Sequence, residues 1–187
     1  MSAVRTTRST NQLELRPYSA ADLDRVVQVF TDAIHVLAAR AYDDAQRAAW
    51  APRPPDISAW RKRVHGLQTW LAVDGDLVVG FVFYETNGHI DLLYASPSHA
   101  RRGVASALYE RAETDLASSG AVALIVEARE VARPFFERCG FVAAEEQEVS
   151  RSGVSFRRFI MRKQLVAENR GAAAARPAAA NRATTEP

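Results

Sequence analysis

Along residues 19–64 the apolar positions recur with the three- and four-residue spacing of amphipathic helices. The clearest run comprises Leu23, Val26, Val27, Phe30, Ile34 and Leu37. Ser19, followed three residues later by Asp22, has the pattern of a helix start with a capping carboxylate. We expect one long helix to about Ala39, a shorter one over 43–50 and, after the Pro-rich break at 51–55, a third over 57–64.

Beyond residue 68 the pattern changes to short apolar runs that are separated by turn residues, and this is typical of strands. Including a first strand near the N-terminus, the expected strands are residues 12–16, 69–73, 77–84, 89–95, 122–126, 142–149 and 155–161. Helices over about 104–120 and 132–140 interrupt this series. The order predicts an α+β fold, a mixed and mainly antiparallel sheet flanked by helices.

Length and composition narrow the class of protein. The 187 residues fit one domain, which we place at 12–165, between a flexible N-terminus (1–11) and a disordered Ala/Arg/Pro-rich tail (166–187). A net charge of +2 gives no reason to expect a nucleic-acid partner, and no apolar run is long enough for a membrane span. The single cysteine, Cys139, excludes an internal disulfide, so we expect a cytoplasmic protein. We also expect no metal site.

One stretch carries specific chemistry, the joint between the apolar run 90–95 and the helix that begins near residue 104. Pro97 ends the strand, and Arg101, Arg102 and Gly103 precede the helix. A helix start leaves backbone N–H groups unpaired and carries partial positive charge, which suits a phosphate. The joint therefore predicts a site for a phosphorylated cofactor.

Two motifs resemble the GNAT acetyltransferase superfamily. The segment Ala100-Arg101-Arg102-Gly103-Val104-Ala105 is similar to its acetyl-CoA signature, although Ala100 departs from the first position, and Ala132 to Phe141 is similar to its closing helix motif. A further string, Ile34-His35, Tyr42 and Trp50-Ala51-Pro52, resembles the YafP-like subgroup. The resemblance covers roughly residues 12–165.

This resemblance implies acetyl-CoA as co-substrate, a phosphate-binding loop and helix, and a splayed central strand whose backbone pairs with the pantetheine arm. The residues that it implies for cofactor binding are Leu93, Tyr94, Ala95, Arg101, Arg102, Gly103, Val104, Ala105, Ser106 and Phe136. Many family members have a tyrosine acid where this chain has Phe136, which carries no acidic proton. Water, Tyr94 or another group then protonates the leaving thiolate, unless its departure needs no acid.

For the general base the central strand offers His89 and Asp91, and Glu85 is a third candidate. Strict alternation would place His89 and Asp91 on one face with Leu93 and Ala95, and Ile90, Leu92 and Tyr94 on the other. His89 matches the position of the carboxylate base in the histone-acetylating branch, and histidine titrates near neutral pH. The alternative interpretations are a turn residue for His89 and a hydrogen bond to a loop for Asp91.

The acceptor site is expected between the first helices and the facing strands, with His35, Tyr42, Trp50 and Glu85 as candidate substrate-binding residues. Alternatively, Trp50 and Trp60 anchor helices in the core, and the basic run at 61–63 is a solvated surface.

We therefore predict an N-acetyltransferase that moves the acetyl group of acetyl-CoA to a primary amine by direct attack in a ternary complex. The acceptor is a small molecule or a peptide, and a homodimer is compatible with the sequence. The alternatives are acetylation of a protein N-terminus or lysine, and a non-catalytic acyl-CoA-binding module.

Overall fold

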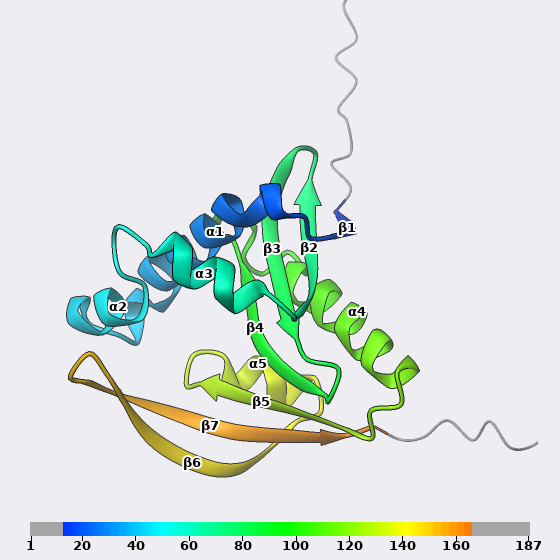
Figure 1. Ribbon diagram of the computed structural model, residues 1–187. Coiled ribbons are helices and arrows are strands. Elements are labelled where there is room, and N and C mark those ends of the chain that lie inside the picture. Colours follow the sequence, from blue (N-terminus) through cyan, green and yellow to red (C-terminus); the bar gives the residue numbers. More distant parts are fainter. Residues whose placement is uncertain (1–12, 166–187) are drawn as a thin grey trace, which may run out of the picture.

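The computed structural model describes residues 13–165, which form a seven-stranded sheet of order β1-β2-β3-β4-β5-β7-β6 with helices on both faces (Figure 1). The predictions for residues 1–11 and 166–187 lie outside the described residues. The strands are β1 Glu14–Pro17, β2 Gln68–Asp74, β3 Leu77–Tyr84, β4 His89–Ala95, β5 Ala123–Arg129, β6 Val142–Arg151 and β7 Val154–Gln164. The α-helices are α1 Leu23–Val36, α2 Asp44–Trp50, α3 Ile57–Val64, α4 Val104–Ser118 and α5 Arg133–Arg138, and the 3-10 turns are η1 Ala20–Asp22, η2 Leu37–Arg40 and η3 Pro97–His99.

The predicted order of elements and the α+β class are confirmed. All the strand pairs are antiparallel except β4 with β5, which is parallel. The long first helix ends at Val36 and continues as the turn η2, slightly different from the single helix that its spacing predicts.

Hydrogen bonds and an ion pair of Asp22 fix the start of α1. The Asp22 carboxylate accepts hydrogen bonds from the Ser19 backbone N–H (2.8 Å) and from both terminal nitrogens of Arg16 on β1 (2.7 and 2.8 Å). The hydrogen bonds from Arg16, and then those from Ser19, lower the pKa of Asp22 to about 2 although the group is largely buried. The predicted capping box therefore also ties the helix to the first strand.

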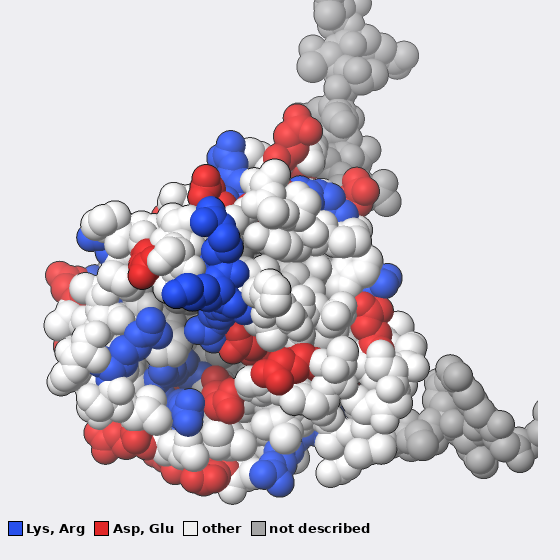
Figure 2. Space-filling model, in the orientation of Figure 1, with Lys and Arg blue, Asp and Glu red and all other residues white. Residues whose placement is uncertain are grey.

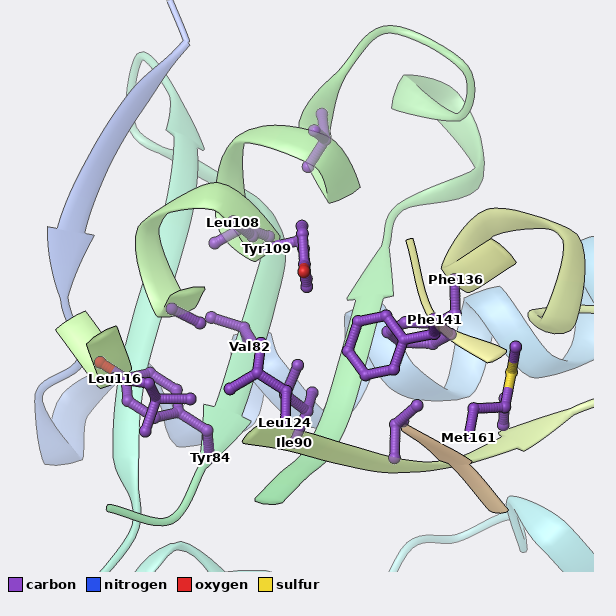
Figure 3. Close-up of a cluster of buried hydrophobic side chains, with 14 of the residues drawn as sticks. Val82, Tyr84, Ile90, Leu108, Tyr109, Leu116, Leu124, Phe136, Phe141 and Met161 are labelled. Atoms are coloured by element: carbon purple, nitrogen blue, oxygen red, sulfur yellow. The ribbon is translucent and has the colours of Figure 1, made fainter. Parts of the chain in front are cut away.

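The two faces of the sheet have separate apolar cores. On one face α1 and α3 pack over the strands, with buried residues such as Val26, Phe30, Phe81 and Phe83. On the other face α4 and α5 cover the core drawn in Figure 3, where Leu108, Tyr109, Leu116, Leu124, Phe136, Phe141 and Met161 meet. Since β3 is covered on both sides, its sequence is an almost continuous apolar run.

The central strands separate soon after they meet. β4 and β5 pair only at His89 with Ile125 and at Ile90 with Val126, and then diverge (Figure 1). From Asp91 to Ala95 the edge of β4 that faces β5 has no strand partner among residues 13–165. The predicted splay of the central strand is confirmed.

The prediction that Ile90 lies on the same face of β4 as Leu92 and Tyr94 is wrong, because the strand contains a bulge. Leu92 pairs with Phe83 while Ile90 pairs with Tyr84, so Asp91 is an extra residue without an opposite partner. In consequence Ile90 shares the α4-side core with Leu93, whereas Leu92 lies in the α1-side core. A single inserted residue exchanges the faces of every following side chain.

Close packing of α4 on the sheet depends on Gly80 of β3. A Cβ at this position would lie 2.5 Å from the Val104 Cγ1 atom and 3.0 Å from the Tyr94 carbonyl oxygen. Val104 is the first residue of α4, and Gly80 pairs with Ala95 at the end of β4. Gly80 therefore sets the distance between the helix start and the splayed strand.

We expect Gly80→Ala to lower the free energy of unfolding by about 1–3 kcal/mol, the usual cost of overpacking a core. Urea denaturation measures this. Because the closest clash is with the Val104 side chain, the double variant Gly80→Ala/Val104→Ala should be less destabilised than the two single effects added together. Strict additivity would show that this contact does not set the helix position.

Candidate functional site

The loop between β4 and α4 presents unpaired backbone donors. Gly103, the N-cap residue of α4, has a φ of +84°, a left-handed conformation that favours glycine. Within residues 13–165 the backbone N–H groups of residues 103–106 donate no hydrogen bond. Arg101 and Arg102 are exposed beside them. A helix start with free donors and adjacent cations has the features of a phosphate site.

Among the residues predicted to bind the cofactor here, Val104 is the one with a buried side chain. Its side chain is 2% exposed and packs into the core, so only its backbone faces the loop. Ala105 is half-buried and Ser106 is exposed. The space around Gly103 is open, so its role rests on backbone conformation and not on lack of room for a Cβ.

The loop contacts the hairpin β2–β3 through two polar interactions. The His99 Nε2 atom lies 3.0 Å from the Asp74 Oδ2 atom, and the Ser96 N–H donates to the Val79 carbonyl at 2.8 Å. Both His99 and Asp74 are largely buried. These contacts fix where α4 begins relative to the end of β4.

The closing helix offers no acid at the predicted position. Phe136 is 4% exposed and packs edge-on against Phe141 and Tyr109. Cys139, the C-cap residue of α5, is partly buried, and burial raises the pKa of its thiol, which favours the unreactive protonated form.

His89 lies between two carboxylates. Its Nδ1 atom is 3.0 Å from Glu85 Oε1, and its Nε2 atom is 2.6 Å from Glu127 Oε2 on β5. Burial disfavours the charged ring, but the hydrogen bonds to Glu85 and Glu127 outweigh it and raise the pKa of His89. The same contact with His89 lowers the pKa of Glu85. Both ring nitrogens are engaged with carboxylates, so in the protonated form the ring has no free lone pair.

Asp91 is engaged in an ion pair with Arg63 of α3. The two groups are joined by two hydrogen bonds, Nε to Oδ2 at 2.9 Å and Nη2 to Oδ1 at 2.6 Å. Residues 61–63 are exposed, as a solvated face requires, and Arg63 is in addition paired with Asp91. The bulge at Asp91 directs this carboxylate toward the helices α1–α3.

A cavity of about 220 Å³ lies on the α1–α3 side of the sheet, next to this ion pair. Most of its wall is apolar, and the charged side chains that line it are Asp56, Arg63 and Arg151. The apolar lining is made by Phe30, Trp50, Ala51, Pro52, Pro55, Ala59, Trp60 and Leu92, with Thr31 beside them. A small, mainly apolar cavity with few charged groups is the usual form of a small-molecule site.

Trp50 connects this cavity with the splayed strand. Its indole N–H donates to the Tyr94 hydroxyl at 3.3 Å, and the Tyr94 ring packs on Phe30 and Phe81. Burial raises the pKa of Tyr94, so its phenol stays protonated at neutral pH. The guanidinium of Arg129 stacks over the Trp50 ring at 3.8 Å and that of Arg151 at 4.8 Å.

The other predicted substrate residues lie around the cavity and not in its wall. His35 contacts the Ala51 carbonyl through Nε2 at 2.8 Å and so holds the cavity lining in place. Tyr42 packs on Phe156 of β7, with its hydroxyl buried. Glu85 contacts His89 and not the cavity. Of the four candidates, only Trp50 lines the cavity.

Sequence reasoning missed Glu127, Arg129 and Arg151. A signal for the first two was present in the alternation of β5, where Leu124, Val126 and Ala128 are buried in the α4-side core. The intervening residues Glu127 and Arg129 therefore point to the opposite face. No local pattern indicates that Arg151, at the end of β6, returns to the cavity.

Figure 2 shows Lys and Arg side chains gathered between α3 and the hairpin β6–β7, around a hollow and beside acidic groups. None of the helices in residues 13–165 is long and apolar enough to cross a membrane. In the same part of the chain no three His, Cys, Asp or Glu side chains are grouped as a metal site would require.

Comparison with known proteins agrees with this geometry. The family model described as an acetyltransferase (GNAT) domain matches residues 38–165. The chain belongs to the GNAT acetyltransferase family. It is 34% identical over 155 residues to the N-acetyltransferase YafP of Escherichia coli (strain K12), covering 81% of this chain and 96% of the relative. The predicted likeness to the YafP-like subgroup is confirmed.

Solved GNAT structures share the fold. The GCN5-related N-acetyltransferase of Rhodopseudomonas palustris superposes with a TM-score of 0.79 at 32% identity, covering 82% of this chain and 96% of the other. The acetyltransferase yncA of Salmonella typhimurium, solved with acetyl-CoA, gives 0.63 at 16% identity, with 82% and 94% covered. As a GNAT acetyltransferase, the chain uses acetyl-CoA as co-substrate.

The contacts of His89 predict its titration in this GNAT protein. By NMR, its pKa should lie above the usual value of about 6.5 and fall in Glu127→Gln and in Glu85→Gln. Since the pKa is raised on folding, the charged ring stabilises the fold fully below about pH 6.5, and this contribution is lost as the pH rises through the folded-state pKa. A pKa at or below 6.5 in the parent protein would contradict the arrangement.

Proposed function

We propose that the protein acetylates a small-molecule primary amine, which attacks acetyl-CoA directly in a ternary complex. The observation that supports this most is that the free donors of residues 103–106 and the unpaired edge of β4 adjoin each other, with the mainly apolar cavity behind the strand. Acetyl-CoA can reach the gap between β4 and β5 from the α4 side, and the amine substrate can reach it from the α1 side.

The chain's residues fit acetyl-CoA. We assign the phosphates to the backbone N–H groups of residues 103–106, with Arg101 and Arg102 at the rim. The backbone of Leu93, Tyr94 and Ala95 would pair with the pantetheine arm, because this edge of β4 has no strand partner. When bound, acetyl-CoA supplies an acetyl group that is already activated as a thioester.

For the general base we propose Glu127, supported by His89. Glu127 is the first residue of β5 beyond the paired region, so it lies where the strands separate. Its carboxylate is partly exposed, whereas both ring nitrogens of His89 are engaged with carboxylates and Asp91 is paired with Arg63. A carboxylate can take the proton of an incoming ammonium, and the contact with His89 orients that carboxylate.

The leaving thiolate has no tyrosine acid at Phe136. On the cavity side, the Tyr94 hydroxyl accepts a hydrogen bond from Trp50 and retains its own proton for donation. We propose Tyr94 for this role, with water as the alternative donor. A release assay for CoA with a panel of amines, amino acids and peptides tests the function, and acetyl-CoA binding without turnover of any amine would favour a non-catalytic binding module.

The phosphate-binding assignment predicts a specific loss in Gly103→Val. A β-branched residue at a φ of +84° is strained by about 1–3 kcal/mol, so acetyl-CoA affinity should fall about tenfold or more in calorimetry. Removal of one exposed charge in Arg102→Ala should cost less than about fivefold.

A matched control for this variant is Gly120→Val, at the other end of α4, where φ is +88° and the surroundings are equally open. It introduces comparable backbone strain but should leave acetyl-CoA affinity unchanged. Equal affinity of Gly103→Val and the parent protein would reject the loop as the phosphate site.

The base assignment predicts that Glu127→Gln lowers kcat by about 10²–10⁴ while the Kd for acetyl-CoA is retained. Glu146→Gln, which removes an exposed carboxylate paired with Arg157 on the outer hairpin, should keep full kcat. If Asp91→Asn abolished turnover and Glu127→Gln did not, Asp91 would be the base and our assignment would be wrong.

A further inference from the structure

Two arginines beside the cavity have no anionic partner among the described residues. Arg129 and Arg151 both stack on the Trp50 ring, yet neither guanidinium forms a salt bridge or a hydrogen bond within residues 13–165. The Nη1 atom of Arg129 is buried without an acceptor. Arg63, the third arginine in this region, differs because Asp91 neutralises it.

An unpartnered cation in this position is costly. Guanidinium groups stay charged at every physiological pH, and burial without an anion removes their hydration without compensation. Burial lowers the pKa of Arg129, and the charges of Arg158 and Arg151 lower it further, against the opposing effects of Tyr42 and Tyr94. A bound anion at this point would compensate the charge that the described residues leave unbalanced.

The spacing on β5 indicates which kind of anion fits. Glu127 and Arg129 are two residues apart on one strand, so their side chains stand on the same face about 6–7 Å apart. One charge is negative and the other positive. An α-amino acid carries its ammonium and its carboxylate on a single carbon. Its ammonium can therefore face Glu127 while its carboxylate faces Arg129.

We propose that the acceptor is a free α-amino acid with an apolar side chain, whose carboxylate binds Arg129 and Arg151 while its amine faces Glu127. This rests on the proposed acetyltransferase function and narrows its substrate class. The side chain of the acceptor occupies the cavity, whose wall includes Phe30, Trp60 and Pro52. In the reaction the ammonium first gives one proton to Glu127, and the neutral amine nitrogen then bonds to the acetyl carbon. The thioester C–S bond breaks, and the proton that the nitrogen loses as it becomes an amide balances the proton that Tyr94 or water gives to the leaving CoA thiolate.

The test compares L-phenylalanine with 2-phenylethylamine, which lacks only the carboxylate. In the parent enzyme kcat/KM should be about 10- to 100-fold higher for phenylalanine, as expected for a charge-assisted contact. In Arg129→Gln and in Arg151→Gln this ratio should fall toward one, because the carboxylate loses a partner. Arg157→Gln removes a charge from β7 that Glu130 and Glu146 already pair, so it should leave the ratio unchanged.

A binding measurement separates this proposal from the proposed function. Trp50 and Trp60 line the cavity, so phenylalanine should change tryptophan fluorescence saturably in the parent protein and about 10- to 100-fold more weakly in Arg151→Gln. If both amines are acetylated equally well, the function stands and the amino-acid inference is wrong. If nothing is acetylated, the proposed function fails, and arginine-dependent binding of phenylalanine still supports the carboxylate site, whereas absence of binding overturns it.

A last control concerns the cofactor. The Kd for acetyl-CoA should be the same in the parent, Arg129→Gln and Arg151→Gln, with melting temperatures showing that the variants are folded. A loss of acetyl-CoA affinity in either folded variant would show that these arginines hold the cofactor, and would overturn the proposal.

Discussion

The separation of β4 from β5 after two residue pairs is the constraint on which the rest of the structure depends. Parallel strands that stay paired would bury their backbone donors and acceptors in a continuous ladder. Here the ladder stops after Ile90 and Val126, which leaves the edge of β4 free. Because α4 connects these two strands, the same separation places the start of the helix beside the open edge.

Packing on both sides holds this opening in place. On the α4 side Gly80 lets the helix approach the sheet closely, and the core in Figure 3 extends from α4 across β5 to β7. On the α1 side the ring of Tyr94 packs on Phe30 and Phe81 behind the strand. Two separate cores therefore support the gap from opposite faces, and the α4-side core spans it, because it contains Ile90 of β4 together with Leu124 and Val126 of β5.

Some charged groups around the gap between β4 and β5 have partners of opposite charge, and others do not. His89 lies between two carboxylates, and Asp91 is joined to Arg63. Arg129 and Arg151 stack on the Trp50 ring and form no salt bridge within the described residues. Stacking on an aromatic ring compensates a cation less fully than a carboxylate does. Arg101 and Arg102 on the cofactor side are exposed, whereas Arg129 is partly buried and Arg151 lines the mainly apolar cavity, and this distinguishes the acceptor side.

The sequence by itself determined the elements and the family. The bounds of α3 and β4, the capping box at Ser19 and the loop before α4 follow from local periodicity and turn chemistry, which act over a few residues. The backbone donors of that loop were predictable for the same reason. The roles assigned to individual cofactor, base and acceptor residues stay predictions that the experiments above test.

Only the tertiary structure decided what lies opposite each functional side chain. The bulge at Asp91 arises from pairing with β3, and it exchanges the faces that alternation predicts. The contacts of His89 with Glu127, 38 positions away, and of Trp50 with Arg129 and Arg151 join separate elements. Such contacts depend on strand register and sheet order, which no short stretch of sequence encodes.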